Sequence, residues 1–145
     1  MNQILVQSSP LMVDSALLFA RLVIGVCFVV HALGKLGLVG PGNMAGFEGW
    51  LKSLGLPFAA VQARMAMLSE LAGGLMITLG LLTRLGLGMC CFTMLVAAVI
   101  GHRGGGYLIT NNPPGNEYAL NLAAICVVLF LLGPGAYSID AFLFL

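Results

Sequence analysis

Charged residues are scarce in this sequence, since six Lys and Arg and five Asp and Glu make up only 8% of 145 residues. Soluble domains carry about 25% charged residues, and a chain this short could not hide so much apolar surface in a core. The 60% hydrophobic content and the mean hydropathy of +1.06 therefore indicate a single domain, residues 1–145, embedded in the lipid bilayer. The net charge of +1 gives no clustered basic face, so nucleic acid is excluded as a partner on electrostatic grounds.

Motifs that would identify a bound cofactor are also missing. The cysteines form no C-x-x-C pair and no metal-type spacing with histidine, and there is no Rossmann fingerprint or phosphate-binding loop. We therefore predict no metal and no covalent cofactor. All four cysteines lie in apolar runs, where a free thiol packs as a small hydrophobic side chain, with thiol redox chemistry as the alternative: Cys27, Cys90, Cys91 and Cys126.

Long apolar runs are what the sequence does contain. A membrane-spanning helix needs about 20 mostly apolar residues. Residues 1–13 contain no Lys or Arg and no A-x-A pattern follows, so we interpret the first run as a membrane span rather than a secretory signal. We expect an all-α, integral membrane four-helix bundle, a multi-pass protein with spans at about 15–36, 61–82, 84–101 and 117–133.

The segments between these runs differ in composition. Within residues 37–57, Phe47, Trp50 and Leu54 recur at helical spacing with charges between them, which predicts a short interfacial helix between the first two spans. Residues 102–116 contain Gly and Pro clusters that exclude regular helix. Small residues in the second and third runs predict close helix packing, namely Gly73, Gly74, Gly80, Gly86 and Gly88.

Ionisable side chains at membrane depth are costly, so each one is a candidate for a functional role. On the first span, His31 and Lys35 are four residues apart and share a helix face, and Arg21 falls on the same stripe. Glu70 lies about 13 Å into the second span. Two interpretations stay open for Arg21 and Glu70, a structural ion pair that joins two helices or membership of a polar site.

Further polar residues flank the segment 102–116. His102 and Glu117 stand at helix ends, where water or lipid headgroups would also accommodate them, and Asn121 follows one turn after Glu117 on the same face. These residues and the charged groups of the first two spans could converge in a polar cavity covered by the interfacial helix and the loop. Because histidine titrates near neutral pH, His31 beside a carboxylate is a candidate for handling protons.

The ordered set of motifs resembles the DoxX-like family of four-helix membrane proteins. The match begins with Arg21, Gly25 and the run His31-Ala32-Leu33-Gly34-Lys35. It continues with Glu70-Leu71-Ala72-Gly73-Gly74, and it ends with Gly133-Pro134-Gly135 and Ser138-Ile139-Asp140. The resemblance implies a bacterial inner (plasma) membrane protein. Members include a subunit of thiosulfate:quinone oxidoreductase and membrane partners of other redox enzymes, so the resemblance suggests quinone as a substrate.

On this basis we expect a quinone-linked oxidoreductase subunit with a redox partner subunit or a second copy of the chain as its partner. His31 and Glu70 are the expected catalytic residues, which exchange protons with the quinone. The expected substrate-binding residues are Arg21, Lys35, His102, Glu117 and Asn121. The alternatives are a non-catalytic membrane anchor or assembly partner for a soluble redox enzyme and, more remotely, a small-solute transporter.

Overall fold

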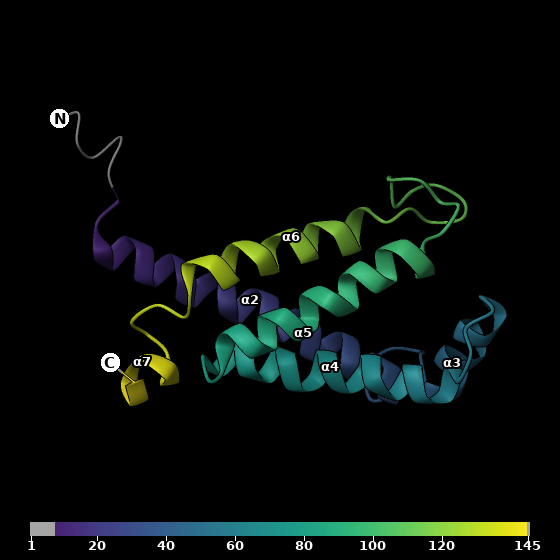
Figure 1. The fold of residues 1–145 in the computed structure, drawn as a ribbon, viewed down its shortest axis with the longest axis horizontal. Coiled ribbons are helices and arrows are strands. Elements are labelled where there is room, and N and C mark those ends of the chain that lie inside the picture. The colour runs from purple at the N-terminus through teal and green to yellow at the C-terminus, as the bar shows by residue number, and fades with distance from the viewer. Residues whose placement is uncertain (1–7, 145) are drawn as a thin grey trace.

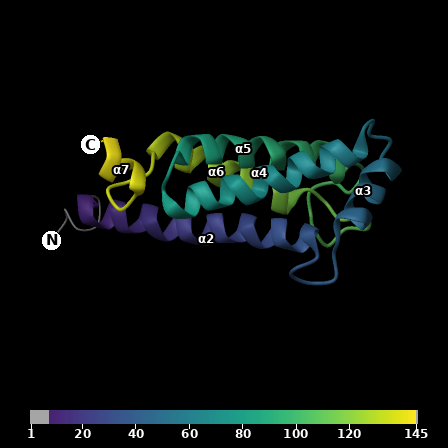
Figure 2. The same cartoon turned by 90° about the horizontal axis from the view of Figure 1, so that it is seen from below.

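The computed structural model describes residues 8–144, which contain helices and no strand. Four helical segments build an elongated bundle, and the two short helices lie at its opposite ends (Figures 1 and 2). The all-α prediction is confirmed for this part of the chain. The elements are α2 (Pro10–Leu36), α3 (Met44–Ser53), α4 (Ala59–Leu79), α5 (Thr83–Val96), the π-helical turn η1 (Ala97–Gly101), α6 (Glu117–Leu132) and α7 (Ile139–Phe144).

The two ends of the bundle differ in what they carry. The start of α2 and the helix α7 lie together at one end, which we call the terminal end (Figure 1). The helix α3 and the loop 102–116 lie at the other, the loop end. The expected helix between the first two spans is therefore present as α3, where the Asn43 side chain accepts a hydrogen bond from the Gly46 N–H at 2.8 Å.

Two helical segments are long and apolar enough to cross a membrane on length and composition, Pro10–Leu36 and Thr83–Gly101. The helix α4 has 21 residues but does not reach the same apolarity, and α6 is apolar but has only 16 residues, about 24 Å of helix. Two of the four expected spans thus contain a helix that could cross a membrane, while the four crossings stay a prediction.

The helix α2 begins five residues earlier than the expected span. Ser9 caps it by accepting a hydrogen bond from the Met12 N–H at 3.3 Å, and Pro10 occupies the first turn, where its missing N–H costs nothing. With 27 residues, α2 is the longest helix.

Glycines set how closely neighbouring helices approach. A Cβ at Gly25 of α2 would lie 2.7 Å from the Gly74 carbonyl oxygen of α4, and one at Gly73 would lie 2.6 Å from the Cys90 Sγ of α5. The packing prediction is confirmed for these contacts, but it is wrong for Gly88, where an added Cβ would have nothing within 4 Å. The helix α4 packs on α2, α5 on α4 and α6 on α5, whereas α2 and α6 barely touch.

The turn between α4 and α5 is held by a residue far along the chain. Gly80 and Leu82 both have positive φ, 69° and 50°, and a non-glycine residue in that region is strained. The Asp140 carboxylate accepts hydrogen bonds from the Leu82 N–H at 2.7 Å, the Thr83 N–H at 2.9 Å and the Thr83 hydroxyl at 2.7 Å. Burial alone would raise the pKa of Asp140, but these hydrogen bonds and the charge of Arg21 outweigh it and lower that pKa.

Candidate functional site

An ion pair between α2 and α4 lies in the loop-end half of the bundle. The Lys35 Nζ bonds to the Glu70 Oε2, and the two side chains are only 17% and 4% exposed. It is the one salt bridge among residues 8–144. The Lys35 Nζ also lies 5.1 Å from the ring centroid of Phe47, so an aromatic ring of α3 lies over the ammonium group. A carboxylate this buried requires such a partner.

The expected Arg21–Glu70 ion pair is wrong. Arg21 Nη2 instead donates to the Tyr137 carbonyl oxygen beyond α6, and Nε and Nη1 have no partner among the described residues although the side chain is only 1% exposed. Because α2 extends past the α4–α5 turn, Arg21 lies against Gly80 at the terminal end. The structure therefore separates Arg21 from Glu70 and leaves it outside the group at the loop end.

His31 is joined to α6 by a tyrosine that was not among the predicted site residues. The Tyr118 hydroxyl lies 2.8 Å from the His31 Nε2 and 3.0 Å from the Cys27 Sγ, within hydrogen-bonding reach of both. The His31 and Tyr118 rings are tilted at 37° with centroids 5.4 Å apart. The sequence could have indicated Tyr118 as a site residue. It follows Glu117 at the start of a helix, and a tyrosine hydroxyl that faces another helix usually forms a hydrogen bond.

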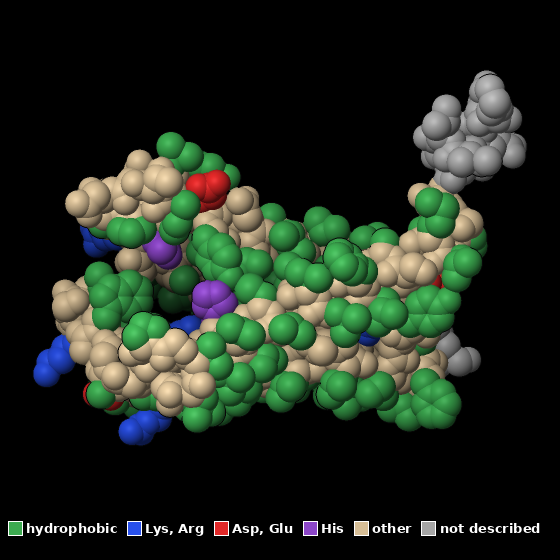
Figure 3. Space-filling view, turned by 180° about the vertical axis from the view of Figure 1, so that it is seen from behind, with side chains coloured by type: hydrophobic (Ala, Val, Ile, Leu, Met, Phe, Trp, Pro, Cys, Tyr) green, Lys and Arg blue, Asp and Glu red, His purple; other side chains and the backbone are tan. Residues whose placement is uncertain are grey.

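The loop end is hollowed on the face seen in Figure 3, between the ends of the helices and the loop. Two purple side chains flank this hollow, and they are the two histidines that the chain contains; a blue Lys or Arg side chain lies beside the lower one. His31 itself is exposed and follows the exposed Val30 on α2. An exposed imidazole on an apolar helix face is costly in lipid unless a polar ligand or water reaches it through such a hollow.

The helix α3 packs against the turn η1 at the loop end and lies beside Lys35 of the ion pair. Phe47 and Trp50 of α3 stack with ring centroids 5.9 Å apart. A Cβ at Gly101 would lie 2.9 Å from the Trp50 ring, so glycine allows the indole to lie against η1. The interfacial helix therefore lies over Lys35, while the expected polar cavity beneath it stays a prediction.

The other expected site residues lie around the loop rather than against Glu70. His102 Nδ1 lies 3.1 Å from the Pro114 carbonyl oxygen, and the Glu117 carboxylate accepts from the Ile109 N–H at 3.1 Å. Glu117 and Asn121 line a groove of about 380 Å³ on α6, together with Tyr118. Tyr118 thus stands between this groove and His31, while Glu117 mainly holds the loop.

The site therefore combines an exposed imidazole, a phenol and a thiol in one hydrogen-bonded row with a buried ion pair one turn further along α2. This set can donate and accept protons and can offer a cation to a developing negative charge. Residues 8–144 contain no group of three or more His, Cys, Asp or Glu placed to hold a metal ion.

Comparisons with known proteins agree with the membrane character of the fold. The DoxX family model matches residues 16–103, which run from the second turn of α2 to just past η1, contain His31, Lys35 and Glu70, and end before α6. The inner membrane protein YphA of Escherichia coli (strain K12) is 30% identical over 132 residues, covering 86% of this chain and 87% of YphA. No solved structure matches.

Proposed function

The chain belongs to the DoxX family and is a bacterial inner membrane protein, and from this premise we propose that it is the membrane subunit of a quinone-linked oxidoreductase. The observation that carries the proposal is that His31, hydrogen-bonded to Tyr118 and beside the hollow at the loop end (Figure 3), lies one helical turn from Lys35, which is paired with Glu70. These groups match what a quinone requires, two protons and a positive charge near its reduced oxygen.

Four crossings form part of the proposal. The helix α4 packs along both α2 and α5, and α6 packs along α5, so all four share one axis (Figure 2). Large apolar side chains face outward from α4 at helical intervals, with Met65 64% and Leu79 53% exposed, and Leu131 of α6 is 72% exposed. An outward face of this kind is stable in lipid and costly in water, which supports lipid contact for α4 and α6 as well.

Reduction of a quinone to a quinol takes two electrons and two protons. The electrons come from a redox partner subunit in this proposal. His31 donates one proton to the near quinone oxygen and is reprotonated through the Tyr118 hydroxyl, which lies 2.8 Å from its Nε2. Lys35 stabilises the negative charge that develops on the quinone oxygen, and the Glu70 carboxylate holds the Lys35 ammonium in place. For the second proton, Glu70 takes up a proton from water in the hollow and passes it to the quinone, which returns Glu70 to the carboxylate. Lys35, rather than Arg21, is the cation near the site.

The single tryptophan provides a direct binding assay. Trp50 is the only tryptophan in the chain and lies on α3 beside Gly101, close to the hollow. Decylubiquinone bound there should quench Trp50 fluorescence of the full chain in lipid nanodiscs. His31→Ala and Glu70→Gln should raise the Kd by about tenfold or more, while Lys52→Ala, at an exposed position on α3, should leave it unchanged. Equal quenching of all four proteins would show partition into lipid only and overturn the proposal.

A second candidate, an anchor for a soluble redox enzyme, is favoured by the loop 102–116. Backbone hydrogen bonds order this loop, including those from the Asn116 N–H to the Gly106 oxygen and from the Glu117 N–H to the Tyr107 oxygen. The ordered loop exposes Tyr107, Leu108 and Ile109, by 52%, 53% and 44%. If the chain is only an anchor, Leu108→Ser should release a co-purifying partner, and His31→Ala should leave both partner and activity in place.

A further inference from the structure

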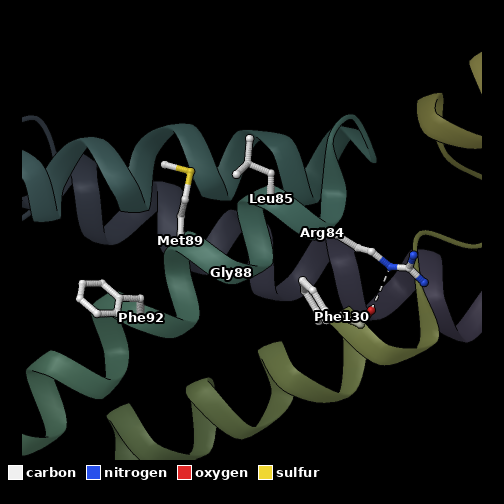
Figure 4. A pocket seen from close by; sticks show the side chains of 6 residues that line it. All are labelled: Arg84, Leu85, Gly88, Met89, Phe92 and Phe130. Carbon is white, nitrogen blue, oxygen red and sulfur yellow. Dashed lines mark hydrogen bonds between the residues drawn. The ribbon is translucent and has the colours of Figure 1, made fainter.

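An open groove lies between α5 and α6, away from the hollow at the loop end. It has a volume of about 490 Å³, and its lining is apolar apart from the arginine at one end (Figure 4). The lining residues are Arg84, Leu85, Gly88, Met89 and Phe92 of α5 and Phe130 of α6. None of them belongs to the proposed quinone site.

The residues of α5 that line the groove recur at helical spacing. Arg84, Gly88 and Phe92 are four residues apart, so they share one face of α5 and span about 12 Å along it. A Cβ at Gly88 would meet nothing within 4 Å, which makes this glycine a gap in an otherwise filled helix face. The gap, with Phe92 beyond it and Phe130 across it, continues the apolar groove along α5.

The charge at the end of the groove has no acidic partner. Arg84 Nε donates to the Phe130 carbonyl oxygen at 3.2 Å, which fixes the side chain between the two helices. No carboxylate lies within ion-pair distance of Arg84 among residues 8–144, where Lys35–Glu70 is the one salt bridge. Arg84 is exposed and sits in the first turn of α5, at the terminal end. A guanidinium without an acidic partner favours a phosphate.

We propose that α5 crosses the bilayer with Arg84 at the headgroup level and that this groove binds an anionic phospholipid, with its phosphate on the Arg84 guanidinium and one acyl chain along Gly88 toward Phe92. The charge complementarity selects an anionic lipid over a neutral one, and the apolar lining selects an acyl chain over a soluble anion. The proposal depends on the membrane location of the chain and not on its redox role.

Native mass spectrometry of the full chain released from detergent micelles tests the site, with phosphatidylglycerol and phosphatidylcholine as the two probes. The wild type should retain phosphatidylglycerol in preference. Arg84→Gln should weaken that retention by about tenfold or more, and Arg84→Lys should restore most of it because the charge is kept. Gly88→Leu should fill the groove and weaken both lipids. Arg103→Gln, an exposed cation on the loop, should change neither.

The same spectra contain the outcomes that would overturn the proposal. Equal retention of both lipids by the wild type, or full retention of phosphatidylglycerol by Arg84→Gln, would remove the headgroup site. A dimer that Gly88→Leu converts to monomer without loss of lipid would assign the groove to a second copy of the chain. Helical content and Tm, measured by circular dichroism for each variant, ensure that a lost lipid reflects the groove and not an unfolded protein.

Discussion

Tyr118 and His31 connect the two helices that otherwise barely meet, through a hydrogen bond of 2.8 Å between the hydroxyl of α6 and the imidazole of α2. The helices α2 and α6 are the first and last of the four-helix bundle. Because they make few other contacts, the bundle would separate most easily between them. The hydrogen bond thus fixes the orientation of His31 and holds α2 and α6 together beside the hollow.

Removing the Tyr118 hydroxyl should weaken quinone binding without unfolding the chain. A single hydrogen bond contributes about 0.5–1.5 kcal/mol, so Tyr118→Phe should raise the Kd for decylubiquinone by about 2–12-fold in the Trp50 quenching assay. Tyr107→Phe, at an exposed loop position, serves as the matched control. An unchanged Kd for Tyr118→Phe would mean that His31 is oriented by other contacts.

The Lys35–Glu70 pair should behave as one unit in unfolding measurements. Removing one partner of a buried pair strands the other charge and costs about 3–5 kcal/mol. Lys35→Met and Glu70→Gln should therefore each lower the free energy of unfolding in micelles. The double variant should lose less than the sum of the two, by about 1 kcal/mol or more. Additive losses would indicate that the two side chains do not interact in the membrane.

The contact between α2 and α4 should tolerate no added methyl group at Gly25. A Cβ there would overlap the Thr78 Oγ1 and lie 2.7 Å from the Gly74 carbonyl oxygen, so the helices must move apart. Gly25→Ala should cost about 1–3 kcal/mol as overpacking does, visible as a lower Tm. Gly49→Ala on α3, where nothing lies within 4 Å, should be neutral or slightly stabilising. Equal Tm values for the two variants would contradict this close packing of α2 on α4.

Acid should weaken the terminal end through Asp140. Its pKa is lowered in the folded chain, so its contribution is fully present above the ordinary value of 3.8 and is lost as the pH falls through the lower folded value. Asp140→Asn should therefore lower the Tm near neutral pH, by an amount corresponding to about 1 kcal/mol, and this difference from the wild type should vanish in strong acid. Glu48→Gln on α3 should show no such pH-dependent difference. If the Tm difference between Asp140→Asn and the wild type persists in strong acid, the effect comes from the changed side-chain shape and not from the carboxylate charge.

The sequence predicted the helices well because apolar runs and Gly-Pro segments are local signals. It also placed His31 and Lys35 on one helix face, because the spacing of residues within a helix does not depend on which other helices pack against it. It failed for Arg21 because helical spacing does not show which neighbour a side chain meets, and the chain beyond α6 brings the Tyr137 carbonyl oxygen to Arg21.

Other features could not be predicted from local pattern at all. Tyr118 meets His31 only because α6 returns beside α2, and 87 residues separate the two. Gly88 resembles the glycines at helix contacts in every respect of sequence, and only the packing shows that it faces open space. The partners of Asp140 likewise depend on where the last segment folds back.

The hydrogen bonds from the α4–α5 turn to Asp140 have a consequence for biosynthesis. Thr83 precedes its acceptor by 57 residues, and ribosomes add about 5–20 residues per second. The hairpin of α4 and α5 is therefore made several seconds before the group that secures its turn, with Leu82 free to leave its strained conformation in that interval. A nascent chain arrested after α6 should consequently be an easier target for membrane proteases than the finished one.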